Sequence, residues 1–440
     1  MRNLSFTSQF YLLCGLLVSG FTLGFVWPVF FNLCKLALYI FGGFIILDAL
    51  LLFLLDGGVR AERTCPERLS NGDANEIKMS IYNDFKFRST IRIIDEVPVQ
   101  LQIRNFLRNT VIEAESNQSF SYTLRPVERG EYHFGDIICL AESPLKLLRR
   151  RFAAPAAQMV PVYPSFIQMR RYEMMAISNR LSEVGIKRIR RLGHTMEFDQ
   201  IREYVPGDDI RTINWQATAR KTSLMVNSYE DERSQHIYSV INMGRVMQMP
   251  FDGLSLLDYA INASLVISNI AMRKQDKAGV ITFSNRVIDF LKAQRQPAHM
   301  ARILELLYRQ ETQFKESDYE ALFLSMLKRL TQRSLILLFS NFETLSGLRR
   351  QLASMQRLAR HHVLVVVFFE NIEMTNLLRQ NASSTEDIYL HTIARQFSFE
   401  KRQIVKELQR YGIHSILTAP ENLTVNALNK YLYLKARGII

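Results

Sequence analysis

The sequence predicts three structural parts, namely two apolar helices that cross a membrane, an antiparallel β-sandwich and a doubly wound α/β domain. The N-terminal stretch is nearly free of charge, and the stretch after it carries short runs in which apolar and polar residues alternate. The C-terminal stretch instead alternates apolar runs with amphipathic helical patterns. These changes of pattern divide the chain into residues 1–58, 59–165, 166–236 and 237–440.

The composition excludes some classes of protein. Hydrophobic residues make up 48% of the 440 residues and charged residues 22%, which excludes a disordered low-complexity chain. The net charge of +13 favours anionic partners such as lipid headgroups or nucleic acid. The four cysteines form no CxxC pair, so a disulfide framework or a zinc ribbon is not expected, and the chain suits a reducing compartment.

Two apolar runs near the N-terminus predict a transmembrane hairpin. Residues 3–34 carry no charged side chain, and the run that resumes at Leu36 contains only Asp48 before it ends at Leu55. A helix needs about 20 apolar residues to cross the hydrocarbon core, so we expect spans near 10–26 and 29–55. A signal peptide is the alternative for the first run, but it lacks a clear basic flank and cleavage site.

Charged residues around the hairpin predict its orientation. Arg60, Arg63 and Arg68 follow the second span, whereas only Lys35 lies near the turn. The positive-inside rule then predicts a two-pass protein of the cell inner membrane whose soluble domains face the cytoplasm. Asp48 is interpreted as a residue that reaches the interface or a helix contact, and a functional intramembrane carboxylate is the alternative.

The region from about residue 75 to 164 predicts a small antiparallel sandwich. The expected strands cover 77–82, 89–94, 99–105, 119–125, 131–140 and 158–163. In 99–106 every second residue is apolar, which predicts one buried and one solvated face. The basic cluster Lys146–Arg151 is interpreted as a solvated edge, with contact to acidic lipid as the alternative.

From about residue 237 the pattern predicts a parallel sheet with helices on both faces. The expected strands cover 237–242, 278–283, 287–292, 335–340, 363–369 and 414–418. The expected helices cover 256–273, 298–309, 318–330, 345–360, 384–411 and 423–435. The pair 278–283 and 287–292 has the spacing of a hairpin.

Residues 193–220 hold a specific pattern between these two regions. It consists of Glu197-Phe198, Arg202-Glu203-Tyr204, Pro206-Gly207-Asp208-Asp209, Arg211, Ile213, Trp215 and Ala219-Arg220. The pattern strongly resembles the signature of the bacterial and archaeal family named for domain of unknown function 58 (DUF58). The resemblance implies a membrane-anchored partner of MoxR-type AAA+ ATPases with a von Willebrand factor A-like C-terminal domain and an undefined biochemical activity.

The same residues have a local physical interpretation. Pro206-Gly207 forms a turn, after which Asp208 and Asp209 cap the next element. The remaining charges predict a partly buried ion-pair network around Trp215, a clamp between the sandwich and the α/β domain. The network and its neighbours comprise Glu197, Arg202, Glu203, Tyr204, Gly207, Arg211, Trp215 and Arg220. A catalytic or metal-binding pair made by Asp208 and Asp209 is the alternative.

The resemblance also implies an ion site at the carboxyl ends of the strands, and the sequence departs from it. The family pattern is Asp-x-Ser-x-Ser after the first strand, where this chain has Asn242, Gly244 and Arg245. After the strand 335–340 an Asp is expected, and the chain has Asn341. Because hard cations prefer carboxylates, we predict no bound metal and no cofactor at this degenerate cleft.

Two acidic residues bear on this cleft. Glu343 or Asp318 as a substitute metal ligand is one alternative. An ion pair of Arg245 with Asp318 or Glu343 that closes the cleft is another, and an anion-accepting contact is a third.

These features favour a membrane-anchored, non-enzymatic adaptor that works with a MoxR-type AAA+ ATPase on an unknown client protein. The sequence contains no P-loop, nucleophile elbow or HExxH motif. The alternatives are an anionic-lipid or nucleic-acid-binding membrane protein that uses Lys187–Arg191 and Lys146–Arg151, and a hydrolase that uses Asp208 and Asp209.

Overall fold

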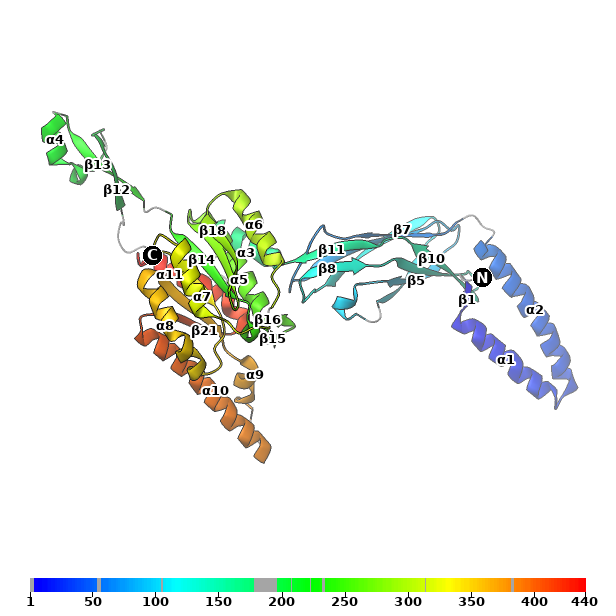
Figure 1. The fold of residues 1–440 in the computed structure, drawn as a ribbon. Helices are drawn as coiled ribbons and strands as arrows, with labels where there is room; N and C mark the ends of the chain where they lie inside the picture. The colour runs from blue at the N-terminus through cyan, green and yellow to red at the C-terminus, as the bar shows by residue number, and fades with distance from the viewer. Residues whose placement is uncertain are drawn as a thin grey trace. The chain divides into compact units, whose positions relative to one another are not determined.

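A computed structural model describes most of the chain. The described residues are 4–53, 57–103, 106–177, 196–206, 208–221, 223–231, 234–312, 314–380 and 384–440, without the side chains of 177, 196–200 and 228–231. The chain divides into two compact units, Met1–Tyr163 and Pro164–Ile440, and each is described by itself (Figure 1).

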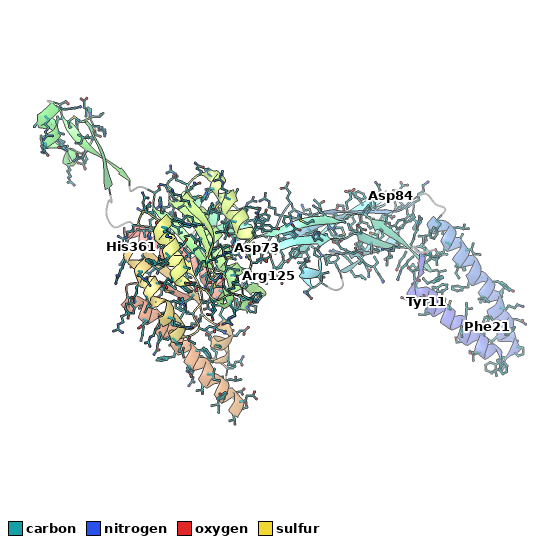
Figure 2. All side chains as sticks on the ribbon, in the orientation of Figure 1. Tyr11, Phe21, Asp73, Asp84, Arg125 and His361 are labelled. Carbon is teal, nitrogen blue, oxygen red and sulfur yellow. The ribbon has the colours of Figure 1, made fainter. Side chains whose placement is uncertain are left out.

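The first unit begins with a short strand and two antiparallel helices, β1 (Leu4–Phe6), α1 (Ser8–Gly24) and α2 (Pro28–Phe53). The helices approach closely at Gly24, where a Cβ atom would lie 2.8 Å from the backbone nitrogen of Phe31. Tyr11 and Phe21, both of α1, are labelled in Figure 2, and the ring of Phe21 lies 5.7 Å from that of Phe31 in α2. Among the described residues, α2 is the one helix long and apolar enough to span a membrane, whereas α1 has only 17 residues.

The rest of this unit consists of strands arranged in three sheets. The strands are β2 (Val59–Thr64), β3 (Leu69–Ser70), β4 (Asn75–Asn83), β5 (Ser89–Asp95), β6 (Leu107–Ile112), β7 (Ser116–Leu124), β8 (Gly130–Phe134), β9 (Ile137–Glu142), β10 (Leu148–Ala154) and β11 (Gln158–Tyr163). They pair in the orders β1-β10-β9-β5-β6, β2-β4-β7 and β3-β11-β8. Ile81 of the second sheet shares a core with Ile91 and Cys139 of the first, so these two sheets pack face to face. One pair, β3 with β11, is parallel, so the pairing is not wholly antiparallel.

Two expectations for this unit are wrong. The expected strand 99–105 is not present in its described part, 99–103, because Val99–Leu101 forms a 3-10 helix (η1) after Pro98 and Gln102 has a φ of 55°. Val99 is 84% exposed, so its alternation with polar neighbours marks no buried face. The expected single strand 131–140 is two strands, β8 and β9, because the chain turns at Gly135, whose N–H donates to the carbonyl of Glu96 at 2.8 Å.

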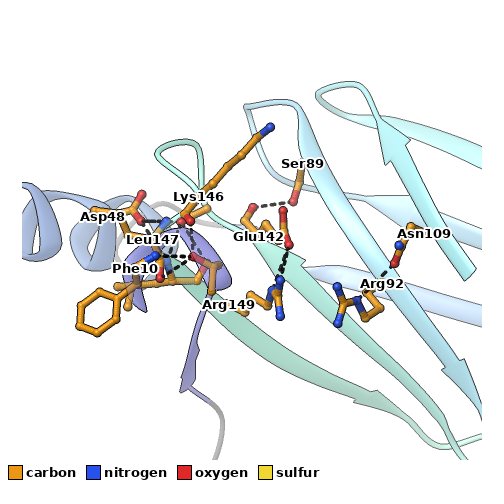
Figure 3. Close-up of polar contacts among 12 residues, drawn as sticks. Phe10, Asp48, Ser89, Arg92, Asn109, Glu142, Lys146, Leu147 and Arg149 are labelled. Carbon is orange, nitrogen blue, oxygen red and sulfur yellow. Dashed lines mark hydrogen bonds and ion pairs between the residues drawn. The ribbon is translucent and has the colours of Figure 1, made fainter. Parts of the chain in front are cut away.

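A buried carboxylate connects α2 to the turn between β9 and β10 (Figure 3). Asp48 is fully buried and accepts a hydrogen bond from the hydroxyl of Ser143. It also accepts hydrogen bonds from three backbone N–H groups, those of Leu145 at 3.2 Å, Leu147 at 3.2 Å and Leu148 at 3.3 Å. We call this arrangement the Asp48 latch.

Other contacts around the latch tie both helices to the same turn. The N–H of Thr7, before α1, donates to the carbonyl of Leu147 at 3.1 Å. Arg150 donates to the carbonyl of Leu52 at 2.9 Å, and Leu52 lies in the core of the β region. The partner of Asp48 is therefore within the protein, namely the turn between β9 and β10.

The basic cluster Lys146–Arg151 is partly engaged within the protein. Arg149 pairs with Glu142 at 2.9 Å (Figure 3), and the Arg150 guanidinium lies over the rings of Phe53 and Phe152. The sequence pattern indicates a solvated edge. In the structure, the residues from Leu148 on belong to strand β10, which pairs with both β1 and β9.

The second unit contains a six-stranded sheet in the order β18-β17-β14-β19-β20-β21. Its strands are β14 (His236–Asn242), β17 (Lys277–Phe283), β18 (Val287–Gln294), β19 (Leu335–Phe339), β20 (Val363–Phe369) and β21 (His414–Thr418). The strands β17, β14, β19, β20 and β21 pair in parallel, and β18 pairs antiparallel with β17 as the edge strand. The expected parallel sheet and its edge hairpin are both present.

Helices cover both faces of this sheet (Figure 1). They are α3 (Phe166–Ile177), α5 (Leu256–Arg273), α6 (Pro297–Tyr308), α7 (Tyr319–Arg329), α8 (Leu345–His361), α9 (Ile372–Leu377), α10 (Thr385–Arg410) and α11 (Leu423–Ala436). One core joins the sheet to α5, α6 and α11, and the other joins it to α7, α8 and α10. A separate antiparallel pair, β12 (Met196–Glu203) and β13 (Met225–Asp231), carries the signature residues, with η3 (Ile210–Thr212) and α4 (Trp215–Lys221) between its strands.

Candidate functional site: the carboxyl edge of the sheet and the signature hairpin

Asn242 ends strand β14 at the carboxyl edge of the sheet, and its side-chain amide is fully hydrogen-bonded inside the protein. Its nitrogen donates to the hydroxyl oxygens of Ser340 at 2.9 Å and Tyr319 at 3.4 Å. Its oxygen accepts from the N–H of Gly244 at 2.8 Å and the hydroxyl of Ser317 at 2.6 Å. Asn242 and Ser340 are both 0% exposed, so this polar cluster is closed to solvent.

The loop after β14 packs against the loop before α7 without space for a side chain. A Cβ atom at Gly244 would lie 2.2 Å from the Ser317 hydroxyl and 3.0 Å from the carbonyl of Lys315. A serine hydroxyl at position 244 therefore has no room in this arrangement. That this cleft binds no metal ion stays a prediction. Its structural reason is that the Asn242 side-chain oxygen already accepts two hydrogen bonds, from the Gly244 N–H and the Ser317 hydroxyl.

The expected partners of Arg245 are wrong. Arg245 is exposed and its nearest ion-pair partner is Glu316, at 3.9 Å. Asp318 instead caps helix α7, accepting from the N–H groups of Glu320 at 2.9 Å and Ala321 at 3.0 Å. Arg245 therefore does not close the cleft through Asp318 or Glu343.

Asn341, beyond the end of β19, is held by a lysine from a distant helix. The Lys401 ammonium of α10 donates to the side-chain oxygen of Asn341 at 2.7 Å. The same ammonium lies 5.8 Å from the ring centroid of Phe368. Burial lowers the pKa of Lys401 to about 8, and the Glu343 carboxylate partly offsets this effect. Nothing in the sequence pattern singled out Lys401, because α10 carries several basic residues.

A cavity of about 710 Å³ opens beside Asn341 and Lys401. Its walls come from the carboxyl ends of β20 and β21, from α9 and α10 and from the loop before α5. Among the lining side chains are the apolar Phe251, Leu256, Phe369, Met374, Leu378 and Leu417. Asn341 and Glu343 border this cavity, whereas Asn242, Gly244, Arg245 and Asp318 do not line it.

In the signature hairpin, the two aspartates organise local backbone. Asp209 is the N-cap of η3 and accepts from the N–H of Arg211 at 3.0 Å. Asp208 accepts from the N–H of Val205 at 3.0 Å and from the guanidinium of Arg202 at 2.6 Å. These bonds lower the pKa of the Asp208 carboxyl, the Arg202 contribution being the largest. The capping interpretation is confirmed for Asp209.

Within the described residues, the expected network around Trp215 is represented by the ion pair of Arg202 with Asp208. Trp215 is 69% exposed at the start of α4, and Arg211 and Arg220 are exposed as well. Glu203 is exposed, and its carboxylate accepts a hydrogen bond from the hydroxyl of Ser223 at 3.4 Å. Tyr204 donates through its N–H to the carbonyl of Leu224 at 2.8 Å. Gly207 and the side chain of Glu197 lie outside the described residues.

The hairpin presents several large apolar side chains to solvent. They are Ile201, Val205, Ile210, Trp215 and Leu224, which we call the hairpin surface. Ile210 is 71% exposed, about as much as Trp215. Exposed large apolar side chains gathered on one small element are a feature of protein interaction sites.

Comparisons with known proteins find sequence matches over part of this chain. Residues 200–378 match the family described as protein of unknown function DUF58. A stretch of 128 residues is 27% identical to the uncharacterized protein YeaD of Bacillus subtilis (strain 168). That match covers 29% of this chain and 31% of the relative, so the chain spans about a third of that relative's length.

Solved structures share only weak likeness with this chain. The CARDB domain of the PF1109 protein from Pyrococcus furiosus is 10% identical, with a TM-score of 0.17, over 24% of this chain and 93% of that domain. A β-glucosidase from Listeria innocua is 12% identical, with a TM-score of 0.14, over 24% of this chain and 17% of the enzyme. Likeness at this level carries no argument about function.

Proposed function

We propose, from the DUF58 match and the hairpin surface, that this protein is a membrane-anchored, non-enzymatic adaptor that works with a MoxR-type AAA+ ATPase on a client protein. The observation that carries the proposal is the exposure of Trp215 and its apolar neighbours within the matched segment. Trp is among the residues that contribute most binding energy at protein interfaces. In this proposal the hairpin surface binds the ATPase.

The proposal includes a two-pass membrane anchor and a von Willebrand factor A-like domain in the cytoplasm. The anchor is supported by the apolar helices α1 and α2 and by the Asp48 latch, which fixes them to a folded domain. The domain assignment is supported by the six-stranded sheet with one antiparallel edge strand. The engaged oxygen of Asn242 supports partner binding that does not require a metal ion.

The hydrolase alternative receives less support from the hairpin. Asp208 and Asp209 are occupied by backbone N–H groups and by Arg202, which is how turn and cap residues behave. Within the described part of the chain, no group of three or more His, Cys, Asp or Glu side chains is placed to hold a metal ion.

A mutation at the centre of the hairpin surface tests the proposal. We expect Trp215→Ala to change the free energy of unfolding by less than about 0.5 kcal/mol, because the side chain is exposed, and to weaken binding of the ATPase by about tenfold or more. The measurements are thermal unfolding of the full chain in nanodiscs and titration with the purified ATPase. Phe314→Ala is the matched control, since Phe314 is 72% exposed in the same unit but outside the hairpin.

In-cell cross-linking identifies the partner directly. A photoreactive amino acid at position 215 should form an adduct with a MoxR-type ATPase, and the same amino acid at position 314 should not. Equal adducts from both positions, or unchanged ATPase affinity in Trp215→Ala, would contradict the assignment of this surface.

A further inference from the structure

We propose that the cavity beside Lys401 binds a small carboxylate with an apolar body, and that the Lys401 ammonium is its counter-ion. This site is separate from the hairpin surface, and the inference does not depend on the adaptor role. The cavity belongs entirely to the second unit and lies at the carboxyl ends of parallel strands, where open α/β sheets bind ligands.

The size and lining of the cavity suit a small molecule. Its volume of about 710 Å³ falls within the range of small-molecule pockets, and its walls are mainly apolar. Phe251 lies before α5 and Leu256 is its first residue, whereas Met374 belongs to α9 and Leu378 follows it. Such walls favour an aliphatic or aromatic body over a sugar or a free inorganic ion.

The ammonium of Lys401 is the polar feature that selects the ligand's charge. An ammonium carries three donors, and among the described residues its hydrogen-bond acceptor is the Asn341 oxygen. Asn341 is 4% exposed and neutral, so it orients the ammonium without neutralising it. A charged group in partly apolar surroundings is stabilised most by an opposite charge.

The other charged residues that line the cavity form no ion pair with the Lys401 ammonium. They are Glu343, Glu370, Glu373, Arg379 and Arg402. Glu343, Glu373, Arg379 and Arg402 are exposed and of both signs, so their effects at the rim largely cancel. Glu370 accepts from the Thr375 hydroxyl at 3.4 Å. No ion pair between Lys401 and a carboxylate occurs among the described residues, although Glu343 acts on the ammonium electrostatically.

The same charges favour a single negative charge on the ligand. One ammonium neutralises one carboxylate, and the remaining charges around the cavity, three glutamates and two arginines, supply no net positive charge for a second. A monocarboxylate with an apolar body therefore matches the cavity better than a phosphate ester or a dicarboxylate.

Selective labelling of lysine tests this site in the full chain. The protein in nanodiscs is treated at about pH 8 with an amine-reactive reagent, with or without octanoate, and labelling of each lysine is followed by mass spectrometry. At an octanoate concentration about ten times its dissociation constant, labelling of Lys401 should slow by about tenfold. Octanol, which has the chain without the charge, and acetate, which has the charge without the chain, should protect much less.

Lys430 is the internal control, because burial also lowers its pKa but it does not line the cavity. Its labelling should not respond to octanoate. In addition, Lys401→Met should weaken octanoate binding, measured by saturation-transfer NMR, by about 10- to 100-fold, whereas Lys401→Arg should retain most of it. Unchanged labelling of Lys401, equal protection by octanol, or equal slowing at Lys430 would each overturn the proposal.

Discussion

Asp48 shows how the surroundings of one residue decide its role. A lone carboxylate in an apolar helix invites a functional interpretation, but here the Ser143 hydroxyl and three backbone N–H groups surround it. If the carboxylate were removed, the buried N–H of Leu147 would lose its acceptor, whereas the Ser143 hydroxyl and the Leu148 N–H would keep their bonds to each other's residue. The carboxylate therefore acts as the fixed acceptor that joins α2 to the turn between β9 and β10.

We expect Asp48→Ala to lower the free energy of unfolding of the first unit by about 1–3 kcal/mol, because the buried N–H of Leu147 is left without its acceptor. The measurement is urea unfolding of the full chain in nanodiscs, with proteolysis at the turn 143–148 as a local readout. Asp84→Ala is the control, since its pair with Arg60 is exposed and screened by solvent, so its loss should change the free energy of unfolding little. Equal losses in both variants would contradict the latch.

Lys401 predicts a specific dependence of stability on pH. Its pKa is about 8 in the folded protein and is ordinarily 10.5. Between these values the unfolded chain binds more protons, so the contribution of Lys401 to the free energy of unfolding rises with pH across that window. Comparing the full chain with Lys401→Met from about pH 7 to about pH 10 should show a steeper rise for the unmodified protein. Parallel curves would contradict the depressed pKa.

Individual residues of the candidate site were predictable to different degrees. Asn242 and Asn341 follow strands of a parallel sheet, and the structure confirms that both lie at its carboxyl edge. The exposure of Trp215 was not predictable, because the segment is too short for a helical or strand period to mark a buried face. Lys401 was missed because the residue it contacts lies 60 positions away in the chain.

Among the elements, those of the α/β unit were predicted most closely. The helix 256–273 and the strands 363–369 and 414–418 have the bounds that the pattern predicted. The signals of β20 and α5 are strong because β20 is buried along its whole length and α5 is buried at nearly every position, which gives continuous apolar runs. The strands of the first unit carry weaker signals, so the η1 segment at Val99 was mistaken for a strand and β2, β6 and β10 were missed.

The close contact of α1 with α2 gives a prediction for this pair of helices. We expect Gly24→Leu to separate the helices, because a Cβ at Gly24 already lies 2.8 Å from a backbone atom of Phe31. Cross-linking between cysteines placed at Phe21 and Phe31, whose rings lie 5.7 Å apart, should fall in this variant. Gly15→Leu is the control, since a Cβ there meets nothing within 4 Å. Unchanged cross-linking in Gly24→Leu would show that the pair tolerates the larger residue.

For the whole molecule, the proposed topology places the helix turn and the latch on opposite sides of the bilayer. From Pro28 to Leu47, α2 rises about 30 Å, which matches the thickness of the hydrocarbon core. In a variant without the four native cysteines, Trp27→Cys should react with a membrane-impermeant maleimide added to intact spheroplasts. Lys146→Cys should react only after permeabilisation, and its labelling from outside would reverse the proposed orientation.

The Asp48 latch also has a mechanical consequence. Because the end of α2 is bonded to the β9–β10 turn and Leu52 packs in the β core, the link between helix and domain does not depend on the covalent chain alone. Contacts of this kind restrict rotation of the β domain relative to α2, so a force that rotates the β domain also rotates the helix pair. In the proposed membrane topology, a force on the β domain would therefore tilt the helix pair, and a change in bilayer thickness would tilt the β domain in return.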